Sequence, residues 1–199
     1  MLGFEPNDYG AFMFTKEIKS LQDMKGCVIN TLDPTASILA ELAGSSATYL
    51  PPEELYTSLA LGVIDGVEYG GAKAMSEMGL HEVAKYFIEP HHQLAYFPFY
   101  FINQDLWNEL TPDLQSILTE AVWANGIYMK SFYAYGENKA LAKMRAAGVK
   151  VCTLPDEDVE AIFQKALAWL ETDYAAMSPR CERAANACLE ALRDFGRID

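Results

Sequence analysis

The chain has 199 residues, of which 51% are hydrophobic and 22% charged, and its formal net charge is −13. This composition is typical of a globular protein that is long enough to bury a sizeable core. The acidic balance argues against nucleic acid or an anionic membrane as a partner, because contacts with phosphate groups need clustered lysine and arginine. The sequence contains no apolar run of about 18 residues, so no segment is typical of a membrane-spanning helix.

The four cysteines are too few for a disulfide-built scaffold and lack the CxxC spacing of zinc or redox sites. Cys181 and Cys188 fall in one predicted helix, separated by about 10 Å of rise, which is too far for a disulfide. Cys27 and Cys152 fall in short strand-like segments and could be neighbours, although buried free thiols are the interpretation we favour. The N-terminus, MLGFEPNDYG, has neither the basic nor the apolar segment of a signal peptide.

The first half of the chain alternates short apolar strands with helices. Proline, acidic first-turn residues and glycine stops mark the helix ends. In chain order we expect an extended segment over 4–15, one helical turn after Ser20, a strand over 27–31, a helix over 34–43, a strand over 47–50, a helix from 51 to Gly62, a strand over 63–65 and a helix over 72–87. This order predicts a parallel sheet with right-handed crossovers.

The second half is mainly helical. Thr111-Pro112-Asp113 is typical of a helix start, and Gly148 is the first strong stop after it. A continuous helix over this range would be roughly 50 Å long. A strand over 148–152, a helix from Asp156 to about Met177 and a last helix over 179–195 follow.

The stretch Leu55 to Gly71, LYTSLALGVIDGVEYGG, combines a helix end, a glycine stop and a short strand that leads into Glu68 and Tyr69. Ligands of open α/β sheets bind outside the carboxyl ends of the strands. The sequence therefore predicts a binding site around Glu68 and Tyr69.

This stretch resembles a segment of the solute-binding proteins of TRAP transporters, the DctP family. Four other segments resemble the family in the same order: IKSLQDMKG at 18–26, HHQ at 91–93, LTPDLQ at 110–115 and AAGVKV at 146–151. The resemblance covers most of Ile18 to Leu170. It implies an α/β, periplasmic-binding-protein-like lobe with a parallel-rich sheet over 18–93. Residues 94–199 would supply a crossover strand, a long bridging helix and C-terminal helices that pack on the lobe.

The resemblance implies an extracytoplasmic or periplasmic protein that captures a small organic solute for a membrane permease and performs no chemistry. The family's first lobe needs far more chain than the residues that precede Ile18. We therefore expect a fragment, a truncated relative or half of an assembly. Apolar surface that the missing lobe would leave uncovered predicts a homo-oligomer, formed by dimerisation or element swapping.

Asn30 occupies the position at which the family carries an arginine that clamps the ligand carboxylate. No arginine precedes Arg145, and Lys73 is the only cation close in sequence to Glu68 and Tyr69. A neutral amide cannot make the charged, bidentate contact of a guanidinium group. Asn30 is either a ligand-facing amide with altered specificity or a solvated residue in a protein that has lost the original function.

Glu68 could hold a cation, contact a ligand hydroxyl or amine, or lie in solvent. The branch of the family that binds 2-oxo acids has a Glu-Trp pair here, in a metal-bridged site. Tyr69 replaces the tryptophan, and we expect a ligand contact without a metal. The same branch has Trp-His-Glu where this chain has His91-His92-Gln93. Both histidines cannot easily hold one ion, because consecutive residues of an extended chain point to opposite faces.

The complete candidate site consists of Asn30, Glu68, Tyr69, Lys73, His92, Gln93, Tyr96 and Phe97. The last two belong to an aromatic segment that could wall a cleft or fill a core. We expect an uncharged or amine-bearing ligand and no cofactor. Motifs of common enzymes such as GxSxG, a P-loop or HExxH are missing from the sequence. Two alternatives stand: an oligomerisation module that binds nothing, and a small hydrolase or lyase that uses Glu68 and His92.

Overall fold

The computed structural model describes residues 2–4, 10–89 and 99–199. Its main sheet has the strand order β4-β3-β5-β2-β6-β8. The strands are β2 (Ala11–Phe14), β3 (Val28–Asn30), β4 (Ser46–Thr48), β5 (Gly66–Tyr69), β6 (Tyr86–Ile88) and β8 (Lys150–Cys152). The β3–β4, β3–β5 and β6–β8 pairs are parallel, whereas β2 runs antiparallel to β5 and to β6. The predicted parallel-rich sheet is confirmed, with one antiparallel strand at its centre that the sequence pattern did not reveal.

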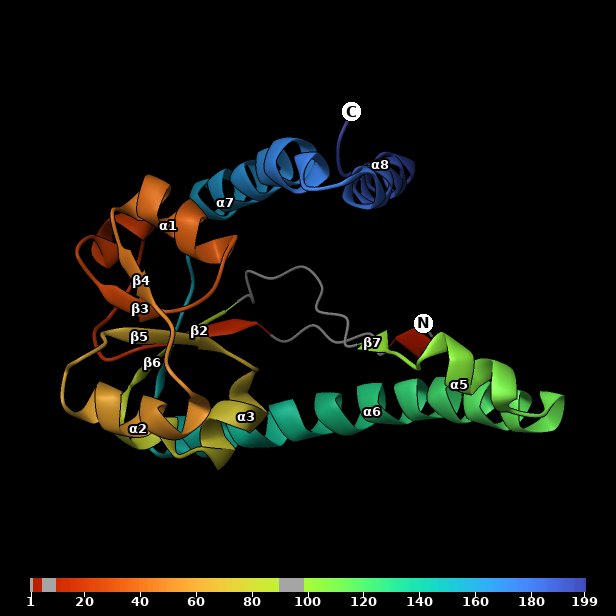
Figure 1. Cartoon of the computed structure of the whole chain (residues 1–199). Helices are drawn as coiled ribbons and strands as arrows, with labels where there is room; N and C mark the ends of the chain where they lie inside the picture. The colour runs from red at the N-terminus through yellow and green to blue at the C-terminus, as the bar shows by residue number, and fades with distance from the viewer. Residues whose placement is uncertain (1, 5–9, 90–98) are drawn as a thin grey trace.

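Helices cover both faces of this sheet (Figure 1). One face packs against α2 (Pro52–Ala60), α3 (Ala72–Glu77), α4 (Leu80–Val83) and the C-terminal end of α6 (Pro112–Ala146). The other face packs against the 3-10 turn η1 (Leu21–Met24), α1 (Thr35–Ala43) and α7 (Asp156–Trp169). The architecture is therefore a three-layer α/β/α arrangement.

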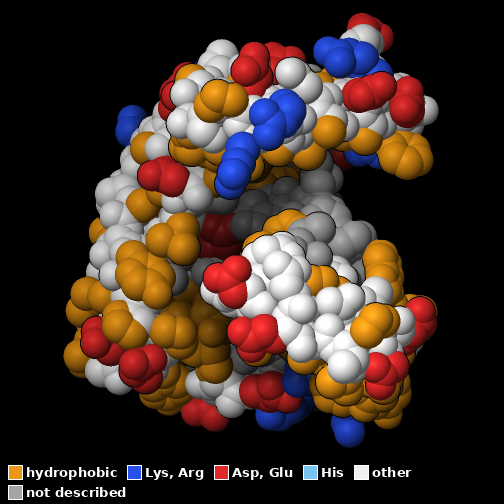
Figure 2. All heavy atoms as spheres, turned by 45° about the vertical axis from the view of Figure 1, so that its right-hand side comes forward, with side chains coloured by type: hydrophobic (Ala, Val, Ile, Leu, Met, Phe, Trp, Pro, Cys, Tyr) orange, Lys and Arg blue, Asp and Glu red, His pale blue; other side chains and the backbone are white. Residues whose placement is uncertain are grey.

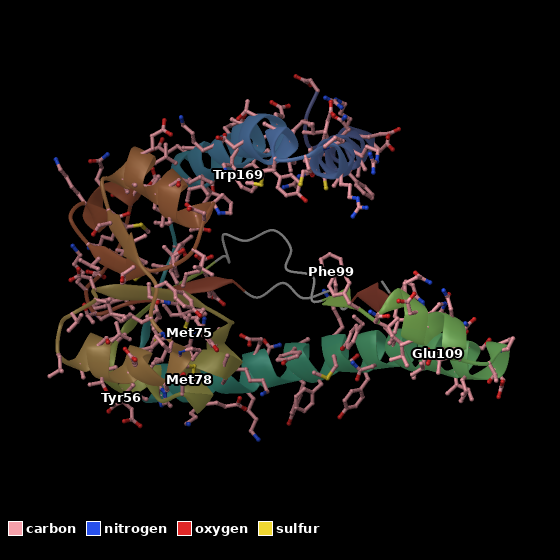
Figure 3. All side chains as sticks on the ribbon, in the orientation of Figure 1. Tyr56, Met75, Met78, Phe99, Glu109 and Trp169 are labelled. Atoms are coloured by element: carbon pink, nitrogen blue, oxygen red, sulfur yellow. The ribbon has the colours of Figure 1, made fainter. Side chains whose placement is uncertain are left out.

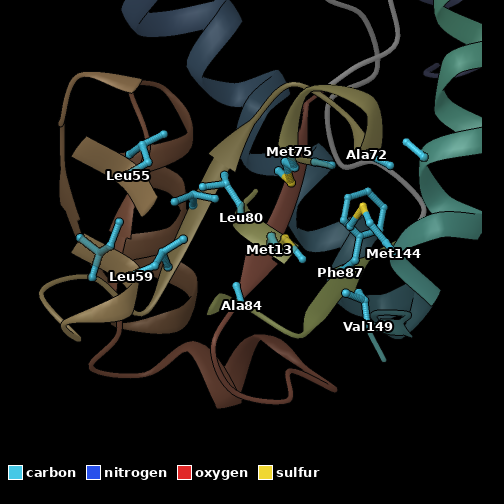
Figure 4. Packing of buried hydrophobic residues seen from close by; sticks show 14 residues of the cluster. Met13, Leu55, Leu59, Ala72, Met75, Leu80, Ala84, Phe87, Met144 and Val149 are labelled. Atoms are coloured by element: carbon cyan, nitrogen blue, oxygen red, sulfur yellow. The ribbon is translucent and has the colours of Figure 1, made fainter. Parts of the chain in front are cut away.

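Successive side chains of strand β2 point to opposite faces of the sheet, so the strand contributes to both hydrophobic cores. Ala11 and Met13 belong to the core under α2, α3 and α6, whereas Phe12 and Phe14 belong to the core under α1 and α7. All four are fully buried, because a sheet covered on both faces has no solvent side. Figure 4 shows Met13 beside Phe87 and Met144, which join the sheet to α6.

Two helical arms leave the sheet on the same side (Figure 1). Helix α6 spans 35 residues, which confirms the long helix predicted from the Thr111 start and the Gly148 stop. Its distal part carries the paired strands β1 (Gly3–Phe4) and β7 (Phe99–Tyr100) and the short helix α5 (Gln104–Glu109). The other arm is α7, continued by the π-helical turn η2 (Leu170–Tyr174) and by α8 (Pro179–Asp194). In the described part of the chain, no helix is long and apolar enough to cross a membrane.

The strand expected over 63–65 begins three residues later. Val63 lies in an exposed turn, and Ile64 is buried in the core. Asp65 joins β3 through its backbone and its side chain: its Oδ2 accepts the Val28 amide at 2.7 Å, and its own amide donates to the Val28 carbonyl at 2.8 Å. The strand then runs from Gly66 to Tyr69, so Glu68 and Tyr69 lie within β5 instead of after it.

The helix expected over 72–87 is also shorter than predicted. Gly79, with φ of +73°, separates α3 from α4, and Phe87 pairs with Met13 in strand β6. The cysteine interpretation that we favoured is confirmed for Cys27 and Cys152, which are both buried free thiols. They do not lie next to each other, because β3 and β8 are separated by three intervening strands.

Candidate functional site

A cavity of about 570 Å³ opens at the carboxyl ends of β3 and β5. Its walls come from the loop after β3, the start of α1, the loop after β4, the loop after β5 and helix α6. The lining residues are Gly10, Asn30, Thr31, Leu32, Asp33, Pro34, Thr35, Tyr49, Leu50, Pro52, Glu68, Tyr69, Gly70, Gly71, Ala74, Tyr133 and Glu137. In Figure 2 the molecule is deeply hollowed between its two arms, and acidic side chains are visible at the back of the hollow.

Glu68 contributes a carboxylate to this cavity from β5. The hydroxyl groups of Thr31 and Thr35 both donate hydrogen bonds to it, the latter at 3.4 Å. Thr31 is buried directly after β3, and Thr35 is the first residue of α1. Glu68 thus lies near the carboxyl end of β5, and its carboxylate lines the cavity. The two threonine hydroxyl groups orient this carboxylate.

Asn30 ends β3 and lines the same cavity, with 5% of its surface exposed. Its Oδ1 accepts a hydrogen bond from the Leu50 backbone amide at 2.8 Å. This contact ties β3 to the loop that leads into α2. Within the described residues the other end of the amide, Nδ2, has no hydrogen-bond partner. Asn30 is thus a buried cavity residue, and the alternative of a solvated strand end is wrong.

Helix α6 closes the third side of the cavity with Tyr133 and Glu137. The Glu137 Oε1 accepts the Lys73 backbone amide at the start of α3, at 3.0 Å. Gly71 makes this approach possible, since a Cβ atom at that position would lie 2.4 Å from Glu137 Oε2. The pair Gly70-Gly71 in the sequence is compatible with another segment that approaches the backbone closely here. It does not indicate that this segment is the part of α6 that carries Glu137.

The cavity is acidic. Asp33, Glu68 and Glu137 line it, and no lysine, arginine or histidine is found among the described lining residues. Lys73, a predicted site residue, is not brought to the cavity. Its ammonium group pairs with Glu77 at 2.8 Å and lies 5.2 Å from the centre of the Phe132 ring. Groups of acidic, histidine or cysteine side chains that could hold a metal ion are not found in the described ranges.

Of the other predicted site residues, Tyr69 lines the cavity. His92, Gln93, Tyr96 and Phe97 lie outside the described residues. Sequence reasoning missed Thr31, Thr35, Asp33, Tyr133 and Glu137. The first three follow a strand end and could have been found from that position alone, whereas the two residues of α6 gave no signal.

Comparison with protein families matches residues 1–176 to the DctP model, described as bacterial extracellular solute-binding protein, family 7. The chain belongs to this family. The predicted resemblance is confirmed, and it extends over the residues before Ile18 as well. Members of the family are extracellular, which agrees with the expected location outside the cytoplasm.

Two relatives are named as periplasmic binding proteins. The monocarboxylate 2-oxoacid-binding periplasmic protein of Nostoc sp. is 27% identical over 173 residues, which is 81% of this chain and 45% of that protein. The 2,3-diketo-L-gulonate-binding periplasmic protein YiaO of Escherichia coli is 30% identical over 138 residues, which is 68% of this chain and 41% of that protein. The chain therefore spans less than half the length of these two relatives.

A solved structure shows the same relationship in three dimensions. The TRAP periplasmic solute-binding protein of Colwellia psychrerythraea, with bound calcium and pyruvate, matches with a TM-score of 0.79 and 30% identity. The match covers 97% of this chain and 60% of that one. The periplasmic-binding-protein-like fold expected from the sequence is confirmed.

Proposed function

We propose that this chain is part of the solute-binding subunit of a TRAP-type, ATP-independent transporter. It would capture a small organic solute in the cavity at the ends of β3 and β5 and deliver it to the membrane permease. The observation that supports this proposal is the cavity itself, where Asn30, Thr31, Glu68 and Glu137 converge from separate elements. A concave site of a few hundred cubic ångströms with a few convergent polar groups is typical of small-molecule binding.

Capture without chemistry is the mechanism that this arrangement supports. Hydrogen bonds from Thr31 and Thr35 orient the Glu68 carboxylate, and the Leu50 contact holds Asn30 in place. Polar groups that are fixed before the ligand arrives lose little conformational entropy on binding. The alternative of a hydrolase or lyase stays a prediction about Glu68 and His92, and the second of these residues lies outside the described part.

Native mass spectrometry of the purified full chain, followed by denaturing analysis of the same sample, tests the proposal. We expect a defined extra mass in the native spectrum that is lost on denaturation. Thermal shift assays with organic acids, amines, polyols and sugars would then identify the ligand class. A chain that carries no added mass, and whose melting temperature none of these compounds changes, would instead support the module that binds nothing.

We propose in addition that two copies of the chain associate through one face of α6. Leu114, Ile117, Tyr128, Phe132 and Tyr135 are between 44% and 72% exposed. At 3.6 residues per turn they fall within an arc of about 60° on the helix. Ala121 lies in the same arc, and Ala124 lies about 20° beyond its edge. We call the five large residues, Leu114, Ile117, Tyr128, Phe132 and Tyr135, the α6 stripe.

The α6 stripe is suited to pairing with a second copy in the antiparallel sense. A two-fold axis near Ala124 would place Leu114 against Tyr135 of the second copy, and Ile117 against Phe132. The same axis would bring the acidic first half of α6, with Asp113 and Glu120, beside the second half, where basic residues outnumber Glu137. Isologous contacts of this kind are the usual basis of dimers. Light scattering of the purified chain at several concentrations tests the proposal, and a monomer throughout would contradict it.

A further inference from the structure

We infer that Lys73 is a positioning residue of the cavity. The sequence suggested it as a direct ligand contact, but its side chain lies across Gly136 of α6. There it holds the turn of α6 that carries Tyr133 and Glu137, which both line the cavity. The inference rests on the proposed solute-binding function, because it concerns how one wall of that site is fixed.

The stem of the Lys73 side chain lies on the backbone of α6 at Gly136. A Cβ atom at position 136 would lie 2.6 Å from Lys73 Cδ, 3.1 Å from its Cε and 3.4 Å from its Cγ. These are the three atoms closest to that position, so the missing side chain makes room for Lys73. Glycine inside a helix is less favourable than alanine, because it loses more conformational entropy on folding. The close approach of Lys73 therefore accounts for a glycine at this place in α6.

The ammonium group of Lys73 fixes the other end of the side chain. Its Nζ lies 5.2 Å from the centre of the Phe132 ring and 5.6 Å from the centre of the Tyr133 ring, and it pairs with Glu77 at 2.8 Å. The two rings meet edge to face, with their centres 5.9 Å apart. A cation at such distances is attracted by the π-electrons of the rings. These contacts offset the conformational entropy that a lysine side chain with only 19% exposure loses.

The backbone of Lys73 makes a second contact with the same turn of α6. Its amide donates a hydrogen bond to Glu137 Oε1 at 3.0 Å. Tyr133 and Glu137 are four residues apart, so they lie on the same face of the helix, and both line the cavity. Lys73 therefore contacts both cavity residues of α6, one with its ammonium group and the other with its amide.

The contacts of Lys73 with α6 lie where this helix leaves the main sheet. Figure 3 shows α6 passing beside α3, which carries Met75, and continuing along the arm toward Glu109 at its far end. On the C-terminal side of these contacts, α6 is anchored in the core by Ala140 and Met144, which are both buried. On the N-terminal side it projects as the arm (Figure 1). Lys73 thus acts at the boundary between the two parts, where a bend of the helix would shift the cavity wall.

Fluorine NMR of the full chain labelled with 3-fluorotyrosine tests the inference at Tyr133, whose signal is identified by its loss in Tyr133→Phe. Lys73→Ala removes the stem and the charge, and it should broaden this signal at temperatures well below the melting temperature. Lys73→Met removes the charge but keeps a stem, and the signal should stay sharp. Lys139→Ala, which removes an exposed lysine from the same part of α6, should have no effect. Equal broadening in the Met and Ala variants, or none in either, would overturn the role of the stem.

A double-mutant cycle with Gly136 tests the same contact while the lysine charge is kept. In the wild type, Gly136→Ala forces the stem of Lys73 off the helix, and it should lower the melting temperature and broaden the Tyr133 signal. In a Lys73→Ala background the crowding atoms are gone, and Gly136→Ala should raise the melting temperature, because alanine favours the helix. The same change of melting temperature in both backgrounds would show that Gly136 is not the seat of Lys73 and would overturn the inference.

Native mass spectra separate this inference from the function on which it rests. The fraction of chains that carry the extra mass of a copurified solute should be several-fold smaller in Lys73→Ala than in the wild type, and Lys73→Met should recover it. An equal loss in both variants would indicate a direct contact between the lysine charge and the solute, and it would overturn the positioning role. Extra mass in none of the three proteins would count against the proposed function, whereas the Tyr133 signal and the Gly136 cycle would still decide whether Lys73 fixes this wall.

Discussion

The side-chain oxygen of Asn30 accepts a hydrogen bond from the Leu50 backbone amide at 2.8 Å. This contact gives Asn30 two roles at once. Its oxygen fixes the loop between β4 and α2, and its nitrogen remains available to the cavity. An arginine at this position could not accept the Leu50 amide, since a guanidinium group has no acceptor. The Asn30 side chain therefore serves local structure as well as lining the cavity.

Asn30→Ala should lower the free energy of unfolding by about 1–3 kcal/mol, because the Leu50 amide loses its partner. Asn30→Asp keeps an oxygen in the accepting position and should cost less than Asn30→Ala at a pH low enough to protonate the new carboxyl group, since at neutral pH its charge would add to those of Asp33, Glu68 and Glu137. Urea denaturation of both variants measures the difference. Equal losses for the two variants would mean that the Leu50 hydrogen bond contributes little to stability.

The contact between Gly71 and Glu137 makes a prediction about the wall formed by α6. Gly71→Ala would place a Cβ atom 2.4 Å from Glu137 Oε2, and it should displace this carboxylate from the start of α3. We expect a loss of about 0.5–1.5 kcal/mol in the free energy of unfolding, because the flexible Glu137 side chain can move away from the new methyl group but then loses its hydrogen bond to the Lys73 amide. Ligand affinity should also fall, because Glu137 lines the cavity.

A double-mutant cycle separates steric overlap from other effects of the added methyl group. In a Glu137→Ala background the overlap no longer exists, and Gly71→Ala should cost much less than in the wild type. Denaturant unfolding of the four proteins provides the cycle. Additive free-energy changes would show that the Gly71 backbone, and not its distance from Glu137, limits this position.

How far the sequence predicted the structure depended on the range of the interactions involved. The ends of α6 follow from local signals, namely Thr111-Pro112 at the start and Gly148 after the end, and they were predicted. The start of β5 depends on Asp65, whose carboxylate accepts an amide 37 residues away, and it was placed too early. Antiparallel β2 carries no periodicity that distinguishes it from a parallel strand, because both of its faces are buried.

The candidate site divides in the same way. Asn30, Glu68 and Tyr69 line the cavity and were predicted, since all three lie at the carboxyl ends of adjacent strands. Glu137 was missed, because it reaches the cavity from a helix that meets Lys73 across 64 residues of chain. Lys73 was assigned by proximity in sequence, and its ion pair with Glu77 directs its charge elsewhere.

His81 predicts a dependence of stability on pH. This residue of α4 is buried, and in the described structure its Nδ1 has no hydrogen-bond partner. Burial and the positive charges of Lys143 and Lys85 lower the pKa of His81 below its usual value, against the opposing effect of Glu82. The unfolded chain then binds the proton at a higher pH than the folded one. The contribution of His81 to stability is therefore retained above the unfolded pKa and decreases as the pH falls through and below it.

His81→Leu removes both the titration and the unpartnered atom. The variant should be at least as stable as the wild type near pH 7 and should lose less stability between about pH 7 and about pH 5. Urea denaturation at several pH values measures both free energies of unfolding. The difference between the two pH profiles isolates the contribution of His81, because the carboxylates titrate in both proteins. Parallel profiles would show that the pKa of His81 does not differ between the folded and unfolded chains.

The α6 stripe leads to a prediction about the oligomeric state. Tyr128 and Ile127 are consecutive residues with similar exposure, 62% and 73%, but they lie about 100° apart around the helix. Tyr128 belongs to the stripe, and Ile127 does not. A glutamate at position 128 would bury a charge at the centre of the proposed antiparallel contact, where it has no partner. Tyr128→Glu should therefore be a monomer, and Ile127→Glu should remain a dimer like the wild type.

Light scattering at a series of concentrations distinguishes these cases, and the matched pair controls for the general effect of a new charge on α6. A wild-type monomer at every concentration would rule out pairing through the stripe. Dissociation of both variants would place the contact on the wider surface of the helix that includes Ile127. Dissociation of Tyr128→Glu alone would locate the interface on the stripe, because only one of two adjacent, exposed positions would then be sensitive to charge.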